Sequence, residues 1–432
     1  MVKYLLKYLL IYVETLLILF GALTLSALIP QSALYKNALS SAISYKKSPP
    51  QETADGSHYN TTIDNYADVV EIGVMWNMSA PNPFVAALDS KYYDGNDGTK
   101  DYGENYGLYK NIKDGFAPNT DYSRYWHGGA IFLRTMHLLT DIQHIRSILF
   151  LISLLLIALI CYRLFKTGNS LIAILFVVSL IAVQFWNIRL SFEFELAMLV
   201  ALPIVLYCIT HIHKANESLS VWIVSGTLIA FFDILTCELL TLALPIALLL
   251  AIRQRKGELL DLRSELLAMA KKTIVWGTAY LVTFLSKWGL ASLAMGENRI
   301  LNAIEAASVR VGGEVDTPMS TIELFFSSIP ANLSVIMGGT ERVSWSMVII
   351  AFLIIGCALF YIYYNRRKMN IPFITLMLVL ALMPFIRYLI LSNHSYLHNY
   401  FTYRALAIPV FAILTICFIG QSAAPANKSS KK

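Results

Sequence analysis

The 432-residue sequence has little charge and few cysteines. Asp, Glu, Lys and Arg make up 14% of the residues and hydrophobic residues make up 56%, a balance that excludes an ordinary soluble globular protein. The five cysteines lie in or beside apolar stretches and include no CxxC pair. We therefore expect them to be small core residues, and we expect neither a disulfide framework nor a metal site built from them.

Motifs for common cofactors are missing as well. The sequence has no GxxxxGK[ST] and no GxGxxG, so we expect no ATP-driven transport by this chain alone. It has no HExxH motif either, and His394 and His398, four residues apart, have no third ligand at a clear spacing. Hydrogen bonding to phosphate or sugar is the favoured role of this pair, and a divalent cation is an optional cofactor.

Long apolar runs are abundant. About ten of them reach or approach the roughly 20 residues that cross a hydrocarbon core. We therefore predict an all-α integral membrane protein with spans at 8–29, 147–164, 171–186, 195–212, 221–235, 239–252, 273–293, 345–364, 373–391 and 403–418.

Basic residues between these runs follow the positive-inside rule. With both termini in the cytoplasm, the clusters at 163–166, 253–256, 263–272, 366–368 and 428–432 all lie on the cytoplasmic side. This pattern accounts for the net charge of +6 without a nucleic-acid partner. The resulting domains are a first span (1–29), a large extracytoplasmic loop (30–145), a transmembrane bundle (146–294), a second extracytoplasmic loop (295–344), C-terminal spans (345–420) and a cytoplasmic tail (421–432).

Three acidic residues lie in the segment IDNYADVVEIGVMW of the first loop. At about 100° per residue, Asp64, Asp68 and Glu71 share one helix face beside an apolar stripe. Burial near the membrane raises the pKa of a carboxyl group toward the working pH, which suits a general base. Asp68, and then Asp64, are our catalytic candidates. The alternative is the solvated face of a surface helix.

Further polar residues lie near the external ends of the spans, where an ionisable group usually has a partner or a function. Arginines suit phosphate because the guanidinium group donates two parallel hydrogen bonds and stays charged. Aromatic rings stack on a sugar or form the interfacial belt. The candidate substrate-binding residues are Arg124, Tyr125, Trp126, His127, Asp233, Lys287, Arg387, His394, His398, Tyr403 and Arg404. Asp233 and Glu238 are expected either to orient an Arg or Lys partner such as Lys287 or to form a structural ion pair that closes helix ends, and both alternatives stay open.

The order of one N-terminal span, a large external loop with an acidic segment and many later spans resembles the GT-C superfamily of polytopic glycosyltransferases. The stretches RYWHGGAIFLR, FFDILTCELLTLALP, YLVTFLSKWGLA and NHSYLHNYFTYRA are also similar to segments of poorly characterised bacterial membrane proteins. Superfamily members usually have an acidic pair soon after the first span, whereas the first candidates here are Asp64 and Asp68. The resemblance implies a polyprenyl-phosphate or polyprenyl-diphosphate sugar as donor and a cell-surface glycan, lipid or protein as acceptor.

We therefore predict a glycosyltransferase of the bacterial cytoplasmic membrane, surrounded by membrane lipids, with its active site on the extracytoplasmic side. A lipid-linked oligosaccharide transporter or flippase is one rival, and it predicts polar residues throughout the membrane depth. A glycan polymerase or ligase is a second rival and needs the same arginines and base. A third is a non-catalytic assembly scaffold, in which the polar clusters do not face one cavity.

Overall fold

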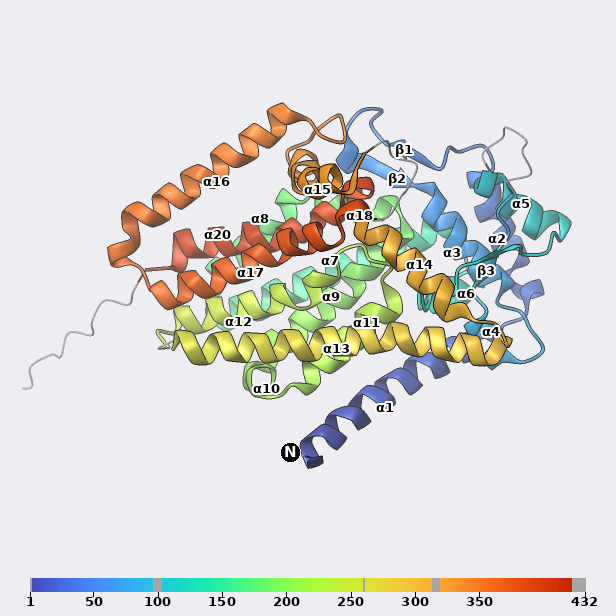
Figure 1. Cartoon of the computed structure of the whole chain (residues 1–432), viewed down its shortest axis with the longest axis horizontal. Coiled ribbons are helices and arrows are strands. Elements are labelled where there is room, and N and C mark those ends of the chain that lie inside the picture. Colours follow the sequence, from blue (N-terminus) through green and yellow to red (C-terminus); the bar gives the residue numbers. More distant parts are fainter. Residues whose placement is uncertain (1, 96–102, 259–260, 313–318, 422–432) are drawn as a thin grey trace, which may run out of the picture.

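The computed structural model describes residues 2–95, 103–258, 261–312 and 319–421. Most of the helices run along the long axis of the molecule (Figure 1). Within these described ranges, six helices are long and apolar enough to cross a membrane: Leu6–Ala27, Ile142–Lys166, Phe192–Thr210, Trp345–Lys368, Ile371–Ile390 and Asn399–Ile419. The fold thus agrees with an all-α membrane protein. The predicted cytoplasmic tail lies, after Gln421, outside the described residues.

The other four predicted spans fall on helices that do not meet these criteria by themselves. Three of them have 13 residues, or about 20 Å of helix, which is shorter than a hydrocarbon core of about 30 Å. The count of ten spans therefore stays a prediction. The four helices are α8 (Ser170–Ala182), α11 (Ser220–Phe232), α12 (Ala243–Arg255) and α13 (Leu262–Met295).

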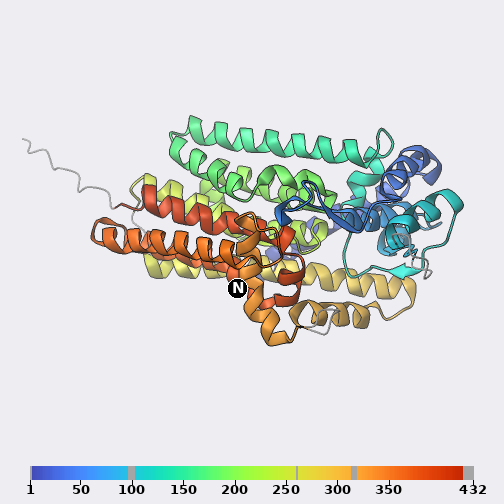
Figure 2. The ribbon, with the colours of Figure 1, turned by 90° about the horizontal axis from the view of Figure 1, so that it is seen from above.

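The central helix of the bundle is α9 (Phe192–Thr210). Its apolar window is 78% buried, against 22% for α7 (Ile142–Lys166) and 17% for α16 (Trp345–Asn365). α9 packs against α7, α11 and α12, and α20 (Ala407–Ile419) packs against α8, α12 and α17 (Ile371–Ile390). α16 lies at the outside in Figure 1, and α7 lies along one edge in Figure 2. The peripheral helices therefore present the apolar side chains that a bilayer would cover.

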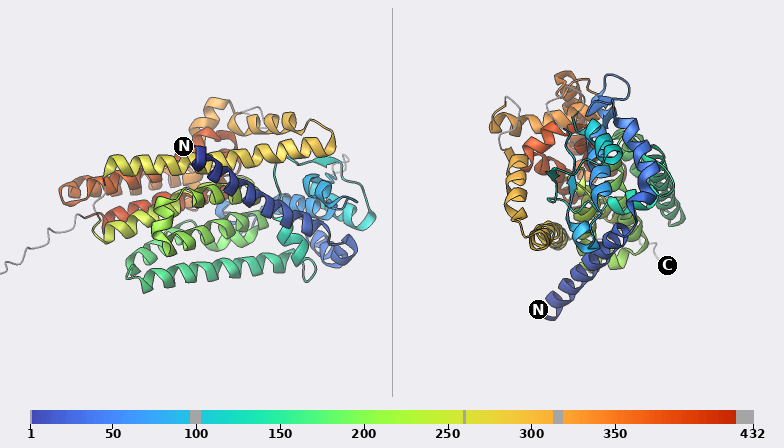
Figure 3. Two further views of the ribbon diagram at one scale, coloured as in Figure 1. Left: turned by 90° about the horizontal axis from the view of Figure 1, so that it is seen from below. Right: turned by 90° about the vertical axis from the view of Figure 1, so that its right-hand side faces the viewer.

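The described residues between 30 and 141, that is 30–95 and 103–141, gather at one end of the bundle, at the right in Figure 1 and nearest the viewer in the right-hand view of Figure 3. Two small antiparallel sheets pair Gln51 with Asp64 and Lys91 with Asp121. The elements of this region are α2 (Gln31–Tyr45), β1 (Gln51–Thr53), β2 (Thr62–Asp64), α3 (Asn65–Asn77), α4 (Pro83–Leu88), β3 (Lys91–Tyr92), α5 (Gly103–Asp114), β4 (Thr120–Asp121) and α6 (Ala130–Met136).

A second segment reaches the same region from the C-terminal half of the chain. It contains α14 (Arg299–Gly312) and α15 (Thr321–Ile336), and both pack against α18 (Ser392–Leu397). The remaining elements are α1 (Val2–Ala27), α10 (Ile212–Glu217), α19 (Asn399–Thr402) and the 3-10 helices η1 (Tyr59–Thr61), η2 (Phe185–Leu190), η3 (Glu238–Thr241), η4 (Arg366–Lys368) and η5 (Tyr403–Leu406).

Several segments predicted to be cytoplasmic meet at the opposite end of the bundle. Arg253 forms an ion pair with Glu265 at 2.7 Å, and Gln254 bonds both Asn370 and the Gln421 carbonyl. The basic segment around Arg253 therefore lies beside residues 370 and 421, at the end of the bundle away from α2 to α6 in Figure 1. The orientation in a membrane stays a prediction.

Gly226 lets α11 approach α13 closely. A methyl group on Gly226 would overlap the Trp276 carbonyl oxygen, whereas nothing lies within 4 Å of a methyl group on Gly277. We expect Gly226→Ala to lower the free energy of unfolding by about 1–3 kcal/mol through overpacking. Gly277→Ala, the matched control, should change it by less than about 1 kcal/mol, in the stabilising direction. Unfolding in detergent measures both, and equal stability of the two variants would contradict the close packing.

Candidate active site

α3 is buried on nearly every side. Eleven of its 13 residues are buried, and Asp64, Asp68 and Glu71 are only 3%, 0% and 2% exposed. The alternative of a solvated surface helix is therefore wrong. Each of the three carboxyl groups lies in a different environment.

Asp68, the first catalytic candidate, is saturated with hydrogen bonds. Its Oδ2 accepts from the Tyr45 hydroxyl at 2.6 Å and from Arg146 Nη1 at 3.0 Å. Its Oδ1 accepts from the Ser191 hydroxyl and the Phe192 backbone N–H, both at 2.7 Å. Asp68 is absent from the lining of the cavities described below. The helical period predicted the face of Asp68 correctly but could not identify Arg146 as its partner. We therefore correct the role of Asp68 from catalytic base to member of a structural ion pair.

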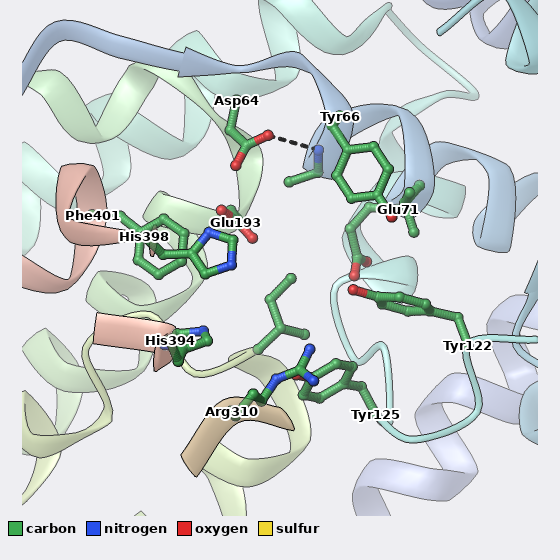
Figure 4. A pocket seen from close by; sticks show the side chains of 13 residues that line it. Asp64, Tyr66, Glu71, Tyr122, Tyr125, Glu193, Arg310, His394, His398 and Phe401 are labelled. Atoms are coloured by element: carbon green, nitrogen blue, oxygen red, sulfur yellow. Dashed lines mark hydrogen bonds between the residues drawn. The ribbon is translucent and has the colours of Figure 1, made fainter. Parts of the chain in front are cut away.

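A polar cavity of about 50 Å³ lies where α3, α9, α14 and α18 converge (Figure 4). Here residues from the first loop, the bundle and the C-terminal region share one space, although they are up to 337 positions apart, from Asp64 to Phe401. The polar cavity is lined by Asp64, Tyr66, Ala67, Val70, Glu71, Tyr122, Tyr125, Glu193, Ile234, Arg310, His394, His398 and Phe401.

Asp64 is the N-cap residue of α3 and reaches this cavity. One carboxylate oxygen accepts from the Ala67 backbone N–H at 3.0 Å and the other from the Tyr400 hydroxyl at 2.6 Å. Burial raises the pKa of Asp64 to about 6, although the hydrogen bond from Tyr400 acts in the opposite direction. A carboxyl group with this pKa accepts a proton readily near neutral pH, which is what a general base requires.

Two further carboxyl groups line the polar cavity with oxygens that have no partner. Glu71 Oε2 and Glu193 Oε1 are buried and make no hydrogen bond in the described part of the chain. Buried polar atoms are normally satisfied, and unsatisfied ones often mark a functional position. Both carboxyl groups face the same space as Asp64 in Figure 4. The cavity therefore offers acceptors for the hydroxyl groups of a ligand.

His394 and His398 lie on the opposite wall, with ring centroids 4.8 Å apart. Burial lowers the pKa of His398 to about 3, helped by Arg310, and lowers that of His394 well below its usual range. Both imidazoles are therefore neutral hydrogen-bonding groups. No group of three His, Cys, Asp or Glu residues able to hold a metal occurs among the residues described. The optional divalent cation therefore stays a prediction.

An apolar cavity of about 270 Å³ adjoins the polar one, between α13 and α14. The two cavities share Tyr125 and Arg310. The apolar cavity is lined by Arg124, Tyr125, Leu235, Glu238, Tyr280, Leu281, Phe284, Trp288, Ala303, Ala307, Arg310, Val311 and Leu391.

Two guanidinium groups flank Tyr125 at this junction. Arg124 and Arg310 each lie 5.6 Å from the centroid of the Tyr125 ring, and the Nε atom of each is buried without a partner in the described chain. Arg124 was expected from the sequence, whereas Arg310 was missed. The available signal was the amphipathic segment 299–312, which keeps Ile300, Leu301 and Ile304 exposed.

Seven of the predicted binding residues line neither cavity, and each has other partners. These are Trp126 (Thr283 carbonyl), His127 (Glu71 and the Tyr122 carbonyl), Asp233 (Thr236), Lys287 (Leu88 carbonyl and Ser90), Arg387 (Glu238, 2.9 Å), Tyr403 (Val183 carbonyl) and Arg404 (Tyr400 and Asn187 carbonyls). Lys287 thus has other partners than Asp233, whereas Glu238 forms the structural ion pair that was the alternative. These side chains therefore join neighbouring elements of the protein and do not point into either cavity.

Comparison with protein-family models, curated proteins and solved structures finds no match to this chain. The function is therefore inferred from the site itself.

The structural role of Asp68 has a direct test. We expect Asp68→Asn to lower the free energy of unfolding by about 3–5 kcal/mol, because it leaves Arg146 buried without its counter-charge. Asp114→Asn, at an exposed position on α5, should change it by less than about 0.5 kcal/mol. Denaturant unfolding in detergent measures both variants. A fully stable but inactive Asp68→Asn protein would return Asp68 to the catalytic candidates.

Proposed function

We propose that the chain is a membrane glycosyltransferase that transfers a sugar from a polyprenyl-phosphate or polyprenyl-diphosphate donor to a cell-envelope acceptor on the extracytoplasmic side. The observation that carries this proposal is the junction of the polar and apolar cavities at Tyr125 and Arg310. Such a donor has an apolar chain, an anionic phosphate and a polyhydroxyl sugar in a row. The two cavities offer a matching environment for each part, in the same order.

The apolar cavity suits the prenyl chain, since Phe284, Ala303 and Ala307 line it. Arg124 and Arg310 suit the phosphate, because a guanidinium group with an unpartnered Nε–H can donate to its oxygens. The carboxyl groups of the polar cavity suit the hydroxyl groups of the sugar and of the acceptor.

The reaction follows from this placement. The acceptor hydroxyl attacks the anomeric carbon, and its proton passes to the Asp64 carboxylate as the new C–O bond forms. The bond from the anomeric carbon to the phosphate oxygen breaks, and its electron pair stays on that oxygen. The guanidinium groups of Arg124 and Arg310 stabilise the charge that develops there. Asp64 is thus the base, in place of Asp68.

The position and lining of the polar cavity agree less well with a transporter than with a polymerase or ligase. A transporter requires polar groups along the whole membrane depth, whereas the polar cavity lies at the end of the bundle that holds residues 30–141. A glycan polymerase or ligase would use the same base and arginines with a longer donor. It therefore remains the second candidate.

The decisive assay uses purified protein and a labelled polyprenyl-phosphate sugar. We expect Asp64→Asn to lower turnover by roughly 10²–10⁴-fold, the usual contribution of a general base. Its melting behaviour should stay close to that of the native chain. Asp114→Asn is the matched control and should retain full turnover. Full turnover in Asp64→Asn would remove the catalytic assignment.

The pH dependence provides a separate check. Asp64 acts as a base only in its carboxylate form, and burial raises its pKa to about 6. Turnover should therefore fall as the pH is lowered through about 6 and reach a plateau above it. A pH series of kcat/KM, which reports the pKa values of the free enzyme, measures this limb. A rate that is constant from pH 7 to pH 5 would exclude Asp64 as the titrating base.

A further inference from the structure

The side chains of Glu71 and His127 lie against each other beside the polar cavity. His127 Nδ1 is 2.7 Å from Glu71 Oε1, and both side chains are at most 2% exposed. The Nε2 atom of His127 is 3.0 Å from the Tyr122 carbonyl oxygen. Both imidazole nitrogens are therefore engaged, one with a carboxyl group and one with the backbone.

The second contact fixes the tautomer. A carbonyl oxygen can only accept, so His127 Nε2 carries a proton. In neutral imidazole the other nitrogen, Nδ1, is then an acceptor that faces the Glu71 carboxyl group. Two acceptors do not approach to 2.7 Å without a proton between them. The pair holds one proton at this contact, either as imidazolium and carboxylate or as imidazole and carboxylic acid.

The backbone keeps His127 in this position. Its φ of +53° is in the left-handed region, which non-glycine residues adopt only where their surroundings impose it. The next two residues are glycines wedged against the bundle: a methyl group on Gly128 would overlap Phe231, and one on Gly129 would lie 2.7 Å from Phe192. Gly128 N–H also donates to the Phe231 carbonyl at 2.9 Å. These contacts fix the backbone of His127 and keep its imidazole within reach of Glu71.

The carboxyl group of Glu71 connects the pair to the site. Glu71 lines the polar cavity, and its Oε2 has no partner among the described residues. In Figure 4 it approaches the cavity from the side of Tyr122, whereas Asp64 approaches from another wall. We propose that Glu71, held by His127, is a second acid–base group, which donates its proton to the departing phosphate oxygen.

This proposal rests on the proposed function, and its proton balance is complete. As the bond from the anomeric carbon breaks, the phosphate oxygen takes the electron pair and the proton that Glu71 shares with His127. The Glu71 carboxylate and Nδ1 of neutral His127 then have no proton between them, so this contact lengthens until the proton is returned. Asp64 meanwhile holds the proton of the acceptor hydroxyl. Transfer of that proton from Asp64 to Glu71 restores both groups. Glu71 is the catalytic residue of the pair, and His127 is a positioning residue.

The test compares two leaving groups. A diphosphate leaves more readily than a phosphate monoester and needs less protonation. We expect Glu71→Gln to lower kcat by roughly 100-fold or more with a polyprenyl-phosphate sugar, in the range of general acid catalysis, and by less than about 10-fold with the diphosphate-linked sugar. Asp64→Asn should lose turnover equally with both donors. Glu305→Gln, at an exposed position on α14, is the matched control and should be unaffected. Equal losses of Glu71→Gln with both donors would overturn the acid role.

NMR spectroscopy tests the shared proton without an activity assay. In protein labelled with ¹⁵N-histidine, His127 should show a protonated Nε2 and a strongly hydrogen-bonded proton at Nδ1, and Glu71→Gln should remove only the latter signal. If Glu71→Gln fails to fold, His127→Gln is used for the assignment and for the two-donor assay. Absence of the Nδ1 signal in the native chain would overturn proton sharing. If the native chain turns over neither donor, the glycosyltransferase proposal and the acid role fail together, while the spectrum still decides the proton-sharing pair.

Discussion

The buried carboxylate of Asp68 holds the region of residues 30–141 against the bundle. It accepts hydrogen bonds from Tyr45 on α2, Arg146 on α7, and Ser191 and Phe192 at the start of α9. A buried charge is costly unless it is paired and fully hydrogen-bonded, and here four donors meet that requirement. The negative charge also lies at the N-terminus of α9, where the helix dipole stabilises it. These contacts give α3 one position relative to the central helix.

The position of the site follows from this anchor. Asp64 and Glu71 lie four residues before and three residues after Asp68, about one turn in each direction, so fixing Asp68 also fixes both of them. Glu193 belongs to the first turn of α9, the helix end that the Asp68 carboxylate caps. One structural ion pair therefore orients the three carboxyl groups of the polar cavity. Asp68, which was the first catalytic candidate from the sequence, therefore positions the other carboxyl groups.

Local patterns predicted much of the helix content and part of the site. Four of the predicted site residues line the polar cavity: Asp64, Tyr125, His394 and His398. Ionisable groups near the ends of apolar helices are costly to expose to hydrocarbon, so they usually face a polar interior. Periodicity places a side chain on a face but does not name its partner, so it could not separate Asp64 from Asp68. The contacts that decide this come from 78 and 336 positions away in the chain. Arg310 could not be predicted from the sequence for the same reason: α14 and α3 line one cavity only in the folded chain.

The division of charge between the two cavities gives a direction to any ligand that enters them. The polar cavity is lined by three carboxyl groups and two neutral histidines, so it favours a ligand rich in hydroxyl groups, and the Asp64 carboxylate disfavours an anion there. A phosphate would be stable only at its rim, where Arg124 and Arg310 flank Tyr125. Beyond the rim the lining becomes apolar, and a charged group would lose its hydration there without compensation. For the donor that we propose, this division of charge favours one direction of binding, with the phosphate at the arginines and the sugar at Asp64.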